Sequence, residues 1–354
     1  MASRDTAMDS ASSSPQPASD RGLAAESFPP PKGPLAVDLE TYYTEAGMDY
    51  RAWSRNFNMH FGFFRWGLNP LRLEGMLEEM SRQVFRRLDL VAGMRVLDLG
   101  CGVGAPARAL IAEHEVEVTA VTKVEWQIAM ARTLSVGLSP RGSVEWKLGD
   151  YTALDLPTGS YQGAFSIEAS CHAAGSSKEP FVAECSRLLG EGAKLVVADG
   201  FMKRSVGLPR WYAALLGYMT RSWAVERFAD LADFVACLEL HGFQVVATEE
   251  ISWHIAPSAF HVPFVTLKFL AGELCLRRKK LNAVRWGHVL ACLISPLIGL
   301  GRPYFGYYLI TAQKRRTLSA ADQRRFVELL LTPPELAPAM NRAKQAHAEL
   351  IESR

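Results

Sequence analysis

The chain has 354 residues, of which 49% are hydrophobic, and its formal net charge is +2. A chain of this length and composition can bury one large core, or a core with an added cap. The near balance of charges gives no electrostatic case for a nucleic-acid partner. Six cysteines are scattered without a Cys-x-x-Cys pair. This spacing argues against a metal site or a disulfide framework and favours a reducing, cytoplasmic compartment.

The N-terminal part of the sequence divides into two segments of different composition. Residues 1–36 are rich in Ala, Ser, Asp and Pro and lack the apolar core of a signal peptide, which predicts a disordered tail. Residues 37–90 are unusually aromatic and are predicted to form a cap. Aromatic faces suit an apolar substrate or a cation, but they suit packing against the core equally well.

A buried strand that runs directly into a glycine turn is the most informative stretch of the chain. Residues 95–99 (RVLDL) are largely apolar, as expected of a parallel strand covered on both faces. Gly100, Gly102 and Gly104 follow, and residues 105–112 have a helix-forming composition with proline in the first turn. Because glycine permits tight turns and close approach to a ligand, this unit predicts a cradle for a small molecule.

Two ligands compete for this cradle. Gly100, Gly102 and Ala105 also fit the dinucleotide fingerprint, which places a pyrophosphate on a helix N-terminus. A dinucleotide enzyme usually ends its next strand in Asp or Glu, whereas Thr122 stands there in this chain. A later strand ends in Gly-Asp at Asp150, a pattern that holds the adenine amino group in methyltransferases. The order of these features favours S-adenosylmethionine (SAM) over NAD, and an inactive domain that keeps its glycines for packing remains an alternative.

Further apolar segments continue the alternation of strands and helices. Together they predict an α/β, Rossmann-like sheet of seven strands with helices on both faces and a helical, aromatic substrate cap. The core is predicted over residues 91–251, and residues 304–316 return to it as the final strand. The other expected strands cover 116–122, 144–150, 161–168, 194–199 and 243–248, with helices at 74–90, 179–189 and 228–241.

Two segments resemble the sterol 24-C-methyltransferase family. Residues 96–108 (VLDLGCGVGAPAR) are similar to its glycine loop, which many lipid and quinone methyltransferases share. Residues 166–173 (SIEASCHA) are similar to its more specific Ile-Glu-Ala-Thr-Cys-His-Ala-Pro segment, although Ala174 replaces the final proline. The aromatic, His-Phe-containing residues 49–62 also resemble the entry segment of these enzymes. The resemblance covers about residues 40–200. It implies a class I SAM methyltransferase fold whose last strand is antiparallel.

The glycine loop and the resemblance together assign the residues that bind the cofactor. They are expected at the ends of successive strands and at the start of the helix that follows the second strand. The predicted cofactor-binding residues are Asp98, Gly100, Cys101, Gly102, Gly104, Thr122, Gln127, Asp150, Tyr151 and Glu168.

Four residues are candidates for catalysis. The resemblance implies an alkene substrate, whose methylation leaves a carbocation that needs stabilisation and a base to remove a proton. The carboxylate of Glu168 can offset positive charge, and the imidazole of His172 can accept a proton near neutral pH. Tyr50 and His60 are expected to line the substrate side. Glu168 could instead hold only the cofactor or the N-terminal arm, and His172 could be a structural histidine.

Residues 252–303 form an insertion far longer than a hairpin requires. Two apolar stretches, 260–276 and 289–300, flank a basic run at 277–280 (RRKK). These stretches look too short and too interrupted to span a bilayer, so a lid that dips into a membrane interface is predicted. The alternative is a helical pair packed on the domain with its basic residues solvated. Residues 317–354 are predicted to form surface helices.

The sequence therefore predicts a SAM-dependent C-methyltransferase that acts on an alkene carbon of a sterol-like, isoprenoid or lipid substrate. One alternative is a tocopherol-type enzyme that methylates a phenol, a quinone or an amine. A cyclopropane-forming lipid enzyme and a SAM-binding membrane partner without activity are further alternatives. Peripheral membrane contact through residues 260–300 and a homo-oligomer are compatible with this prediction.

Overall fold

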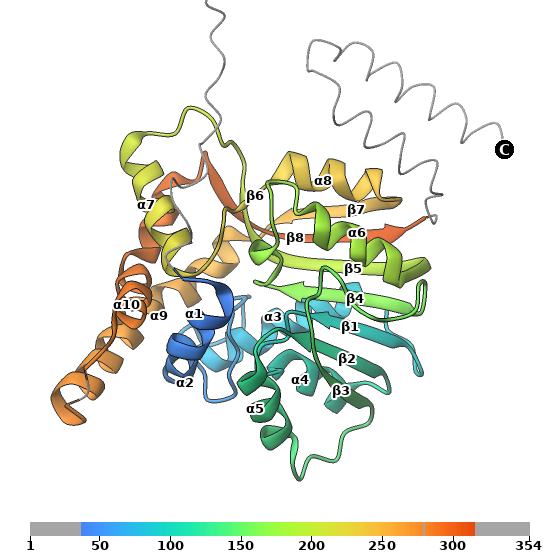
Figure 1. Ribbon diagram of the computed structural model, residues 1–354, viewed down its shortest axis with the longest axis horizontal. Coiled ribbons are helices and arrows are strands. Elements are labelled where there is room, and N and C mark those ends of the chain that lie inside the picture. Colours follow the sequence, from blue (N-terminus) through green and yellow to red (C-terminus); the bar gives the residue numbers. More distant parts are fainter. Residues whose placement is uncertain (1–36, 279, 316–354) are drawn as a thin grey trace, which may run out of the picture.

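A mixed sheet forms the centre of the computed structural model, which describes residues 37–278 and 280–315. The sheet has eight strands in the order β3-β2-β1-β4-β5-β8-β7, with β6 paired to β5 (Figure 1). The predicted tail (1–36) and the predicted C-terminal helices (317–354) lie outside the described residues.

The parallel part of the sheet follows the predicted strands closely. It contains β1 (Arg95–Leu99), β2 (Glu117–Thr122), β3 (Ser143–Leu148), β4 (Tyr161–Ile167), β5 (Leu189–Met202) and the two-residue β6 (Ala229–Asp230). β7 (Phe243–Glu250) and β5 both pair antiparallel with β8 (Phe305–Lys314). The predicted Rossmann-like fold with an antiparallel last strand is therefore confirmed.

Two details of the strands differ from the prediction. β5 is much longer than the expected 194–199, because Leu189 already pairs with β4 and Met202 still pairs with β8. The first residues of the expected helix 228–241 instead form β6, and the helix α8 (Leu231–Leu240) begins after Asp230. The carboxylate of Asp230 caps this helix by accepting a hydrogen bond from the Ala232 amide at 3.1 Å.

Helices cover both faces of the sheet because side chains along each buried strand alternate between the two faces. Val96 of β1 packs in one apolar cluster with α3 (Leu73–Arg87) and α4 (Ala105–Glu113). The next residue, Leu97, belongs to the opposite cluster with α6 (Glu179–Leu188) and α8. α5 (Glu125–Ser135) follows β2 and packs beside β2 and β3.

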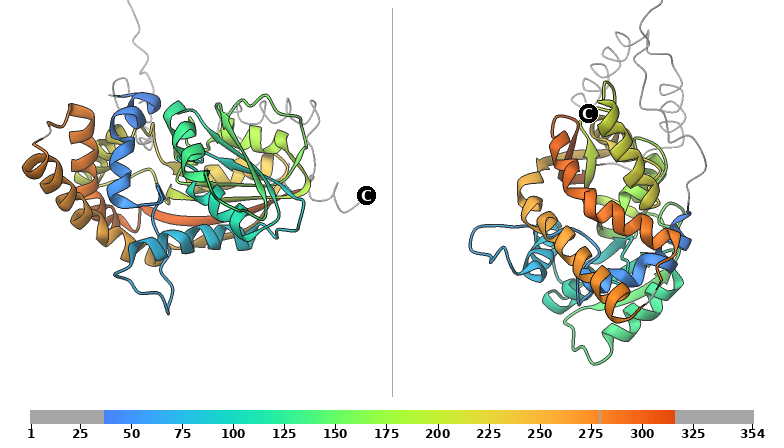
Figure 2. Two further views of the ribbon diagram at one scale, coloured as in Figure 1. Left: turned by 90° about the horizontal axis from the view of Figure 1, so that it is seen from below. Right: turned by 90° about the vertical axis from the view of Figure 1, so that its left-hand side faces the viewer.

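A helical cap stands beside the end of the sheet at which the parallel strands finish (Figures 1 and 2). It is assembled from both ends of the described chain and from the segment that follows β5. Its members are α1 (Leu39–Ala46), η1 (Gly47–Asp49), α2 (Tyr50–Trp53), α7 (Arg210–Ser222), α9 (Ser252–Leu270), η3 (Ala271–Leu276), α10 (Ala283–Ile294) and η4 (Ser295–Gly301).

The apolar insertion is more continuously helical than its sequence suggested. Within the described residues, Ser252–Leu276 and Ala283–Gly301 are long and apolar enough to cross a membrane, judged by length and composition alone. The expectation that these runs are too short and too interrupted is therefore wrong. α9 begins at Ser252, continues through Pro257 and Pro263, and is extended by the π-helical segment η3.

Candidate functional site

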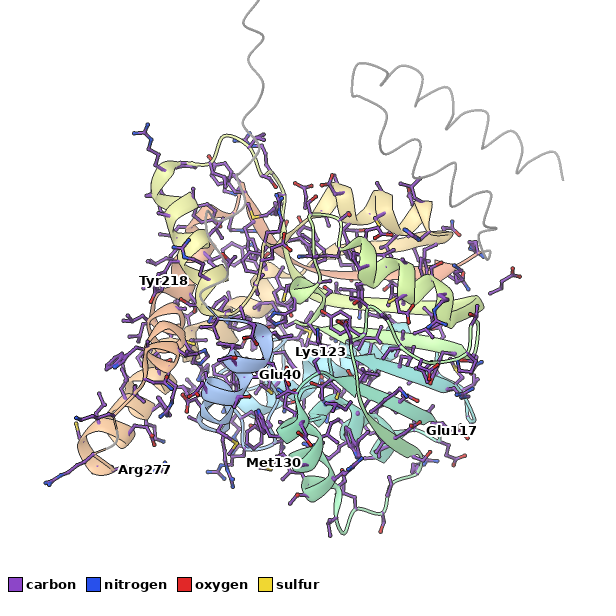
Figure 3. The ribbon with its side chains drawn as sticks, viewed as in Figure 1. Glu40, Glu117, Lys123, Met130, Tyr218 and Arg277 are labelled. Atoms are coloured by element: carbon purple, nitrogen blue, oxygen red, sulfur yellow. The ribbon has the colours of Figure 1, made fainter. Side chains whose placement is uncertain are left out.

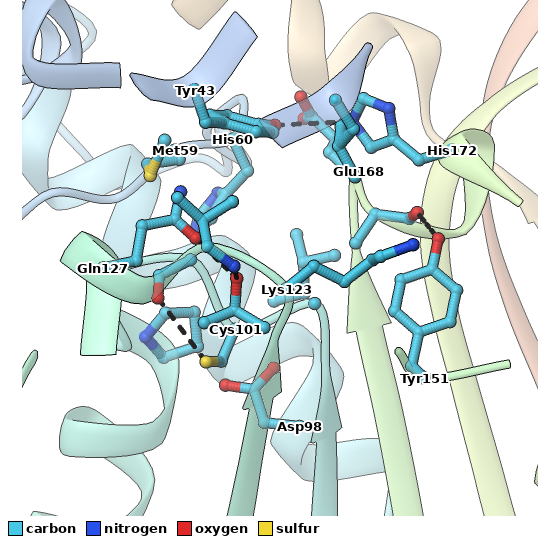
Figure 4. Close-up of a pocket in the computed structure, with 18 of the residues that line it drawn as sticks. Tyr43, Met59, His60, Asp98, Cys101, Lys123, Gln127, Tyr151, Glu168 and His172 are labelled. Carbon is cyan, nitrogen blue, oxygen red and sulfur yellow. Dashed lines mark hydrogen bonds between the residues drawn. The ribbon is translucent and has the colours of Figure 1, made fainter. Parts of the chain in front are cut away.

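The glycine loop after β1 forms the floor of a cavity at the end of the sheet (Figure 4). The amides of Gly100 and Cys101 both donate to the Val121 carbonyl, at 3.0 and 2.8 Å, which fixes the loop against β2. A Cβ atom on Gly100 would lie 2.2 Å from the Cβ of Ala169, and one on Gly104 would lie 2.2 Å from the Trp146 ring. These two glycines are therefore required for packing.

Gly102 has a different role in the loop. Its φ is +54°, and the nearest atom to an added Cβ is the Met59 sulfur at 3.0 Å. Both Gly102 and Met59 line the cavity. A side chain at this position would therefore point into the space that a ligand needs, which is the expected property of a glycine that allows close approach.

The polar atoms of the cavity fit SAM. One carboxylate oxygen of Asp98 (Oδ2) and Nε2 of His60 are buried without a hydrogen-bond partner among the described residues. Burial raises the pKa of Asp98 to about 8, and a bound ammonium group would favour its ionised form. Thr122 donates to the Gln127 side-chain oxygen at 2.6 Å, and both residues line the same cavity. Asp98, Thr122 and Gln127 thus bring a carboxylate, a hydroxyl and an amide to the cavity, and their contacts with SAM stay a prediction.

The structure places Asp150 beside the cofactor cavity but not in its lining. Its carboxylate accepts hydrogen bonds from Lys123 Nζ at 2.8 Å and from the Thr152 amide at 2.9 Å. Lys123 lines the cavity, whereas Asp150 is not among the lining residues. Tyr151 does line it, with a hydroxyl that donates to the Ala169 carbonyl at 2.7 Å. An adenine contact by Asp150 stays a prediction.

Glu168 lies where the cofactor cavity meets a second, larger chamber, and its side chain lines both. Its backbone has φ +50°, a conformation that is uncommon for a residue with a side chain. Oε1 accepts hydrogen bonds from the Phe61 amide at 2.6 Å and from the Tyr307 hydroxyl at 2.8 Å. Burial raises the pKa of Glu168 to about 8, although these two donors favour the carboxylate.

His172 follows Glu168 in the short helix η2 (Ser170–His172) and borders the same junction. Nδ1 lies 3.2 Å from the Ala224 carbonyl, so this nitrogen carries the proton and donates it. Nε2 is consequently an acceptor, 3.3 Å from the Tyr43 hydroxyl. Burial lowers the pKa of His172 to about 4, which keeps the ring neutral at physiological pH.

The other two catalytic candidates occupy different parts of the site. His60 lies at the junction, with Nδ1 2.9 Å from the Phe61 carbonyl and a pKa lowered by burial to about 4. Tyr50 lines the chamber but not the cofactor cavity, and its hydroxyl is 3.1 Å from that of Tyr42. The structure therefore groups His60 with Glu168 and His172 and places Tyr50 farther into the chamber.

The chamber has a volume of about 470 Å³ and walls that are mostly apolar and aromatic. It lies between α1, α2, α9, α10 and the start of β8, which are far apart in the sequence. Among the described residues that line it, Arg302 is the sole lysine or arginine. This guanidinium lies 3.4 Å from Glu250 and 4.3 Å from the centre of the Trp253 ring.

Sequence reasoning missed three residues that build this site. Tyr43 covers the cavity from α1, and its carbonyl accepts a hydrogen bond from the Trp126 indole at 3.0 Å. Tyr307 reaches Glu168 from β8. Lys178 is buried with φ +54° and donates to the carbonyls of Cys171, Ala173 and Arg227 at 3.0, 2.8 and 2.7 Å. An apolar last strand with a central tyrosine was the one available signal. The contact of Tyr43 with Trp126 and the three contacts of Lys178 involve backbone carbonyls, which no residue pattern reveals.

Comparison with known proteins agrees with this geometry. Residues 96–192 match the model of a methyltransferase domain family. Methyltransferase GfsG of Streptomyces halstedii is 28% identical over 84% of this chain and 99% of its own length. 24-Methylenesterol C-methyltransferase 2 of Arabidopsis thaliana is 29% identical over 45% of this chain and 42% of its length. Other relatives include O-methyltransferases, and the chain spans 52% and 53% of the length of two of them.

Solved structures share the fold of this protein. The cyclopropane synthase MmaA2 from Mycobacterium tuberculosis superposes with a TM-score of 0.69 and 17% sequence identity. The match covers 78% of this chain and 97% of that structure. At this level of identity the likeness supports the fold alone.

The chain is a SAM-dependent methyltransferase with the class I fold, and SAM is its cofactor. The predicted enzyme class, fold and cofactor are thereby confirmed. The resemblance to sterol 24-C-methyltransferases is one of several likenesses of similar strength, so it does not by itself define the substrate.

Proposed function

We propose that the protein methylates an alkene carbon of a large, uncharged hydrophobic molecule, such as a sterol-like or isoprenoid lipid. The observation that carries this proposal is the apolar chamber of about 470 Å³ that meets the cofactor cavity at Glu168. A cavity of this size and lining is typical of sites that enclose most of a small hydrophobic ligand. A site for a small polar acceptor would not need such a space.

The charges of the chamber favour an uncharged substrate over a phosphorylated one. Three carboxylates, those of Asp49, Glu168 and Asp199, line it together with Arg302, which is engaged by Glu250. Asp49 is paired with Arg285 at 2.7 Å, and Asp199 accepts hydrogen bonds from Ser170 and two backbone amides. A diphosphate would bring negative charge toward these carboxylates without a cluster of basic partners.

The residues at the junction suit a reaction that generates positive charge. Bound SAM supplies an electrophilic methyl group on a sulfonium. As a carbon–carbon bond to the alkene forms and the sulfur–methyl bond breaks, one positive charge appears on the substrate. The Glu168 carboxylate and the rings of Tyr43, Phe61 and Tyr307 border that position and would stabilise the charge. Loss of a proton then restores a neutral product, with Glu168 or the neutral His172 as the acceptor.

Transfer of labelled methyl groups from SAM to a total lipid extract tests this proposal. We expect label in neutral lipids, stable to mild acid and base, in a product that gains one CH₂ unit and keeps its double bond. Loss of the double bond would instead indicate cyclopropane formation. Label confined to methyl ethers, esters or amines would contradict the proposal.

A second candidate function, methylation of a hydroxyl group, is favoured by the pairing of His172 with Tyr43. A neutral imidazole whose Nε2 accepts a hydrogen bond can take a proton from an alcohol or a phenol, either directly or through the Tyr43 hydroxyl. Several relatives are O-methyltransferases, and one acts on a hydroquinone. His172→Asn and Tyr43→Phe distinguish the two functions, because O-methylation should lose about 100-fold in rate while alkene methylation through Glu168 should lose much less.

A further inference from the structure

The cap presents an apolar surface to solvent along α9 and η3. Trp253, Phe260, Phe264, Leu267 and Leu274 are exposed, between 36% and 71% of their full surface. Their spacing of seven, four, three and seven residues places them on one face of a continuous helix. Soluble monomers rarely leave such a stripe of large side chains uncovered.

A second apolar row lies beside the first. α9 and α10 pack against each other at the margin of the molecule that faces away from the sheet (Figure 2). On α10 and η4, Trp286, Leu290, Leu297 and Leu300 are exposed by 38% to 69%. The two rows together are termed the apolar cap face.

The chamber reaches the apolar cap face. Trp253, Phe260 and Leu300 line the chamber, and they are also 70%, 66% and 69% exposed. The same side chains therefore belong to the chamber wall and to the outer surface. The chamber is therefore open toward the apolar cap face at these three side chains.

Basic residues surround the far tip of this face. Residues 252–303 contain seven lysines and arginines and a single acidic residue, Glu273. Lys268, Arg277, Arg278 and Lys280 are exposed, and Arg277 lies at the end of the cap that is remote from the sheet (Figure 3). Glu273 is buried against Arg277 and Arg285, so its charge is neutralised within the cap. The tip is thus strongly positive.

We propose that the apolar cap face docks on the surface of an anionic lipid bilayer. Large apolar side chains flanked by lysine and arginine are the combination that inserts at the level of lipid headgroups and binds anionic lipids. The positive tip selects an anionic membrane over a second copy of the chain, because two such tips would repel each other. The docking itself does not depend on the reaction, whereas entry of the substrate from the bilayer rests on the proposed function.

The same helices are anchored to the protein in a way that favours lying on a bilayer over crossing it. Ser258 of α9 exchanges hydrogen bonds with the backbone of Gly62, at 2.9 and 3.0 Å. His254 and His261 bind the carbonyls of Phe64 and Pro70, both at 2.7 Å. A helix with one face bound to the core in this way offers only its opposite face to lipid.

Flotation of the full-length chain with lipid vesicles tests the proposal. Vesicles of phosphatidylcholine with about 30% phosphatidylserine should capture the protein, and pure phosphatidylcholine should capture much less. The double variant Phe264→Ser/Leu267→Ser changes two residues of the face that do not line the chamber. It should weaken binding at least about 30-fold, because two side chains lose their burial in lipid. Arg278→Gln/Lys280→Gln should weaken it by roughly fivefold per charge on anionic vesicles alone.

A matched control is provided by Val136→Ser/Leu138→Ser. These residues are 82% and 47% exposed in the loop after α5, outside the cap. The Val136→Ser/Leu138→Ser variant should float with the vesicles to the same extent as the unmodified protein. Equal loss in the control and in Phe264→Ser/Leu267→Ser would mean that the apolar cap face has no special part in binding, and would overturn the proposal.

Parallel measurements separate this inference from the proposed function. Methyl transfer to detergent-dissolved lipids reports the reaction, whereas flotation reports docking. Vesicle binding without lipid methylation would support the docking and contradict the proposed function. Lipid methylation without vesicle binding would overturn the docking. Absence of vesicle binding, together with a dimer in sedimentation that Phe264→Ser/Leu267→Ser abolishes, would identify the face as an interface between copies.

Discussion

The cofactor cavity and the chamber share a wall at Glu168, yet the chain builds them in different ways. Most of the cavity comes from the ends of β1, β2 and β4 and the segments that follow them, while a smaller part comes from residues 39–60 of the cap. The chamber is enclosed by α1, α2, α9, α10 and β8, which lie at opposite ends of the described chain. A site for a shared cofactor is thus local in sequence, whereas a site for a particular substrate is assembled from distant insertions.

The two regions also differ in how their polar groups are satisfied. In the cofactor cavity, Asp98 keeps a buried oxygen without a partner among the described residues, and so does a nitrogen of His60 at the junction. Deeper in the chamber, Tyr42 pairs with Tyr50 at 3.1 Å and with His288 at 2.8 Å, and at its wall only Nε of Arg302 lacks a partner among the described residues. Open polar atoms select a polar ligand, because leaving them unpaired costs free energy. Polar groups that are already paired within the protein do not require a polar ligand, so the shape and the apolar contacts of the chamber select the substrate.

Gly102→Val should break the cofactor side of this comparison with the largest effect. Its side chain would fill the space beside Met59 and would force an unfavourable backbone at φ +54°. We expect at least a 1,000-fold loss of SAM affinity, about 4 kcal/mol, by calorimetric titration. The chamber should still bind lipid.

Gly137→Val separates occlusion from backbone strain in that experiment. Gly137 also has a positive φ, +80°, but an added Cβ meets nothing within 4 Å. This variant should lose some stability and keep its SAM affinity. If both variants lost affinity equally, strain transmitted through the fold would explain the result, and Gly102 would not contact the cofactor.

Glu168→Gln should affect the junction between the two regions. The amide oxygen can keep the hydrogen bonds from Phe61 and Tyr307, but the negative charge is lost. We expect kcat for the alkene substrate to fall about 100-fold, while the dissociation constant of SAM changes less than about threefold. Steady-state kinetics and calorimetry measure the two quantities. A large loss of SAM affinity with an unchanged kcat would show that Glu168 binds the cofactor and has no part in the chemistry.

The cofactor cavity is built mainly from local sequence, whereas the chamber is assembled from distant segments. This difference explains what the sequence could and could not predict. The strand and glycine turn at residues 96–104 have a fixed local geometry, so the Rossmann-like fold and the cavity floor were predictable. Tyr307 was not predictable as a partner of Glu168, because 139 positions separate them in the chain. The surroundings of Asp150 were missed because Lys123 approaches it from the neighbouring strand end. The continuity of α9 through two prolines depends on its packing against the core, which composition does not reveal.

Tyr307→Phe tests whether the last strand tunes the charge at the junction. The hydroxyl donates to Glu168 and favours its carboxylate, so its removal should raise the pKa of Glu168 above the present value of about 8. If the reaction needs the ionised form, kcat/KM falls as pH drops below this pKa. We expect the rising limb of the profile, measured between about pH 6 and 10, to move to higher pH and the rate at pH 7 to fall about tenfold. An unshifted profile would mean that another group controls the pH dependence.

Ala259→Leu should have the smallest effect and should touch only the chamber. Ala259 lies on α9 and lines the chamber but not the cofactor cavity, so a larger side chain shortens the space available to the substrate. Leucine is also a good helix former, and the added atoms can extend into the open chamber without repacking the core. We expect KM for the full-length lipid to rise about threefold, with little change for a shortened analogue.

Ala112→Leu on the exposed surface of α4 provides the matched control, since it makes the same change away from both cavities. Its KM and its SAM affinity should equal those of the unmodified protein. If Ala259→Leu weakened SAM and lipid binding alike, the two regions would be mechanically coupled through α9 and the cap. The shape of the chamber would then no longer select the substrate independently of cofactor binding. The two regions would still differ in how the sequence builds them, but they would not function separately.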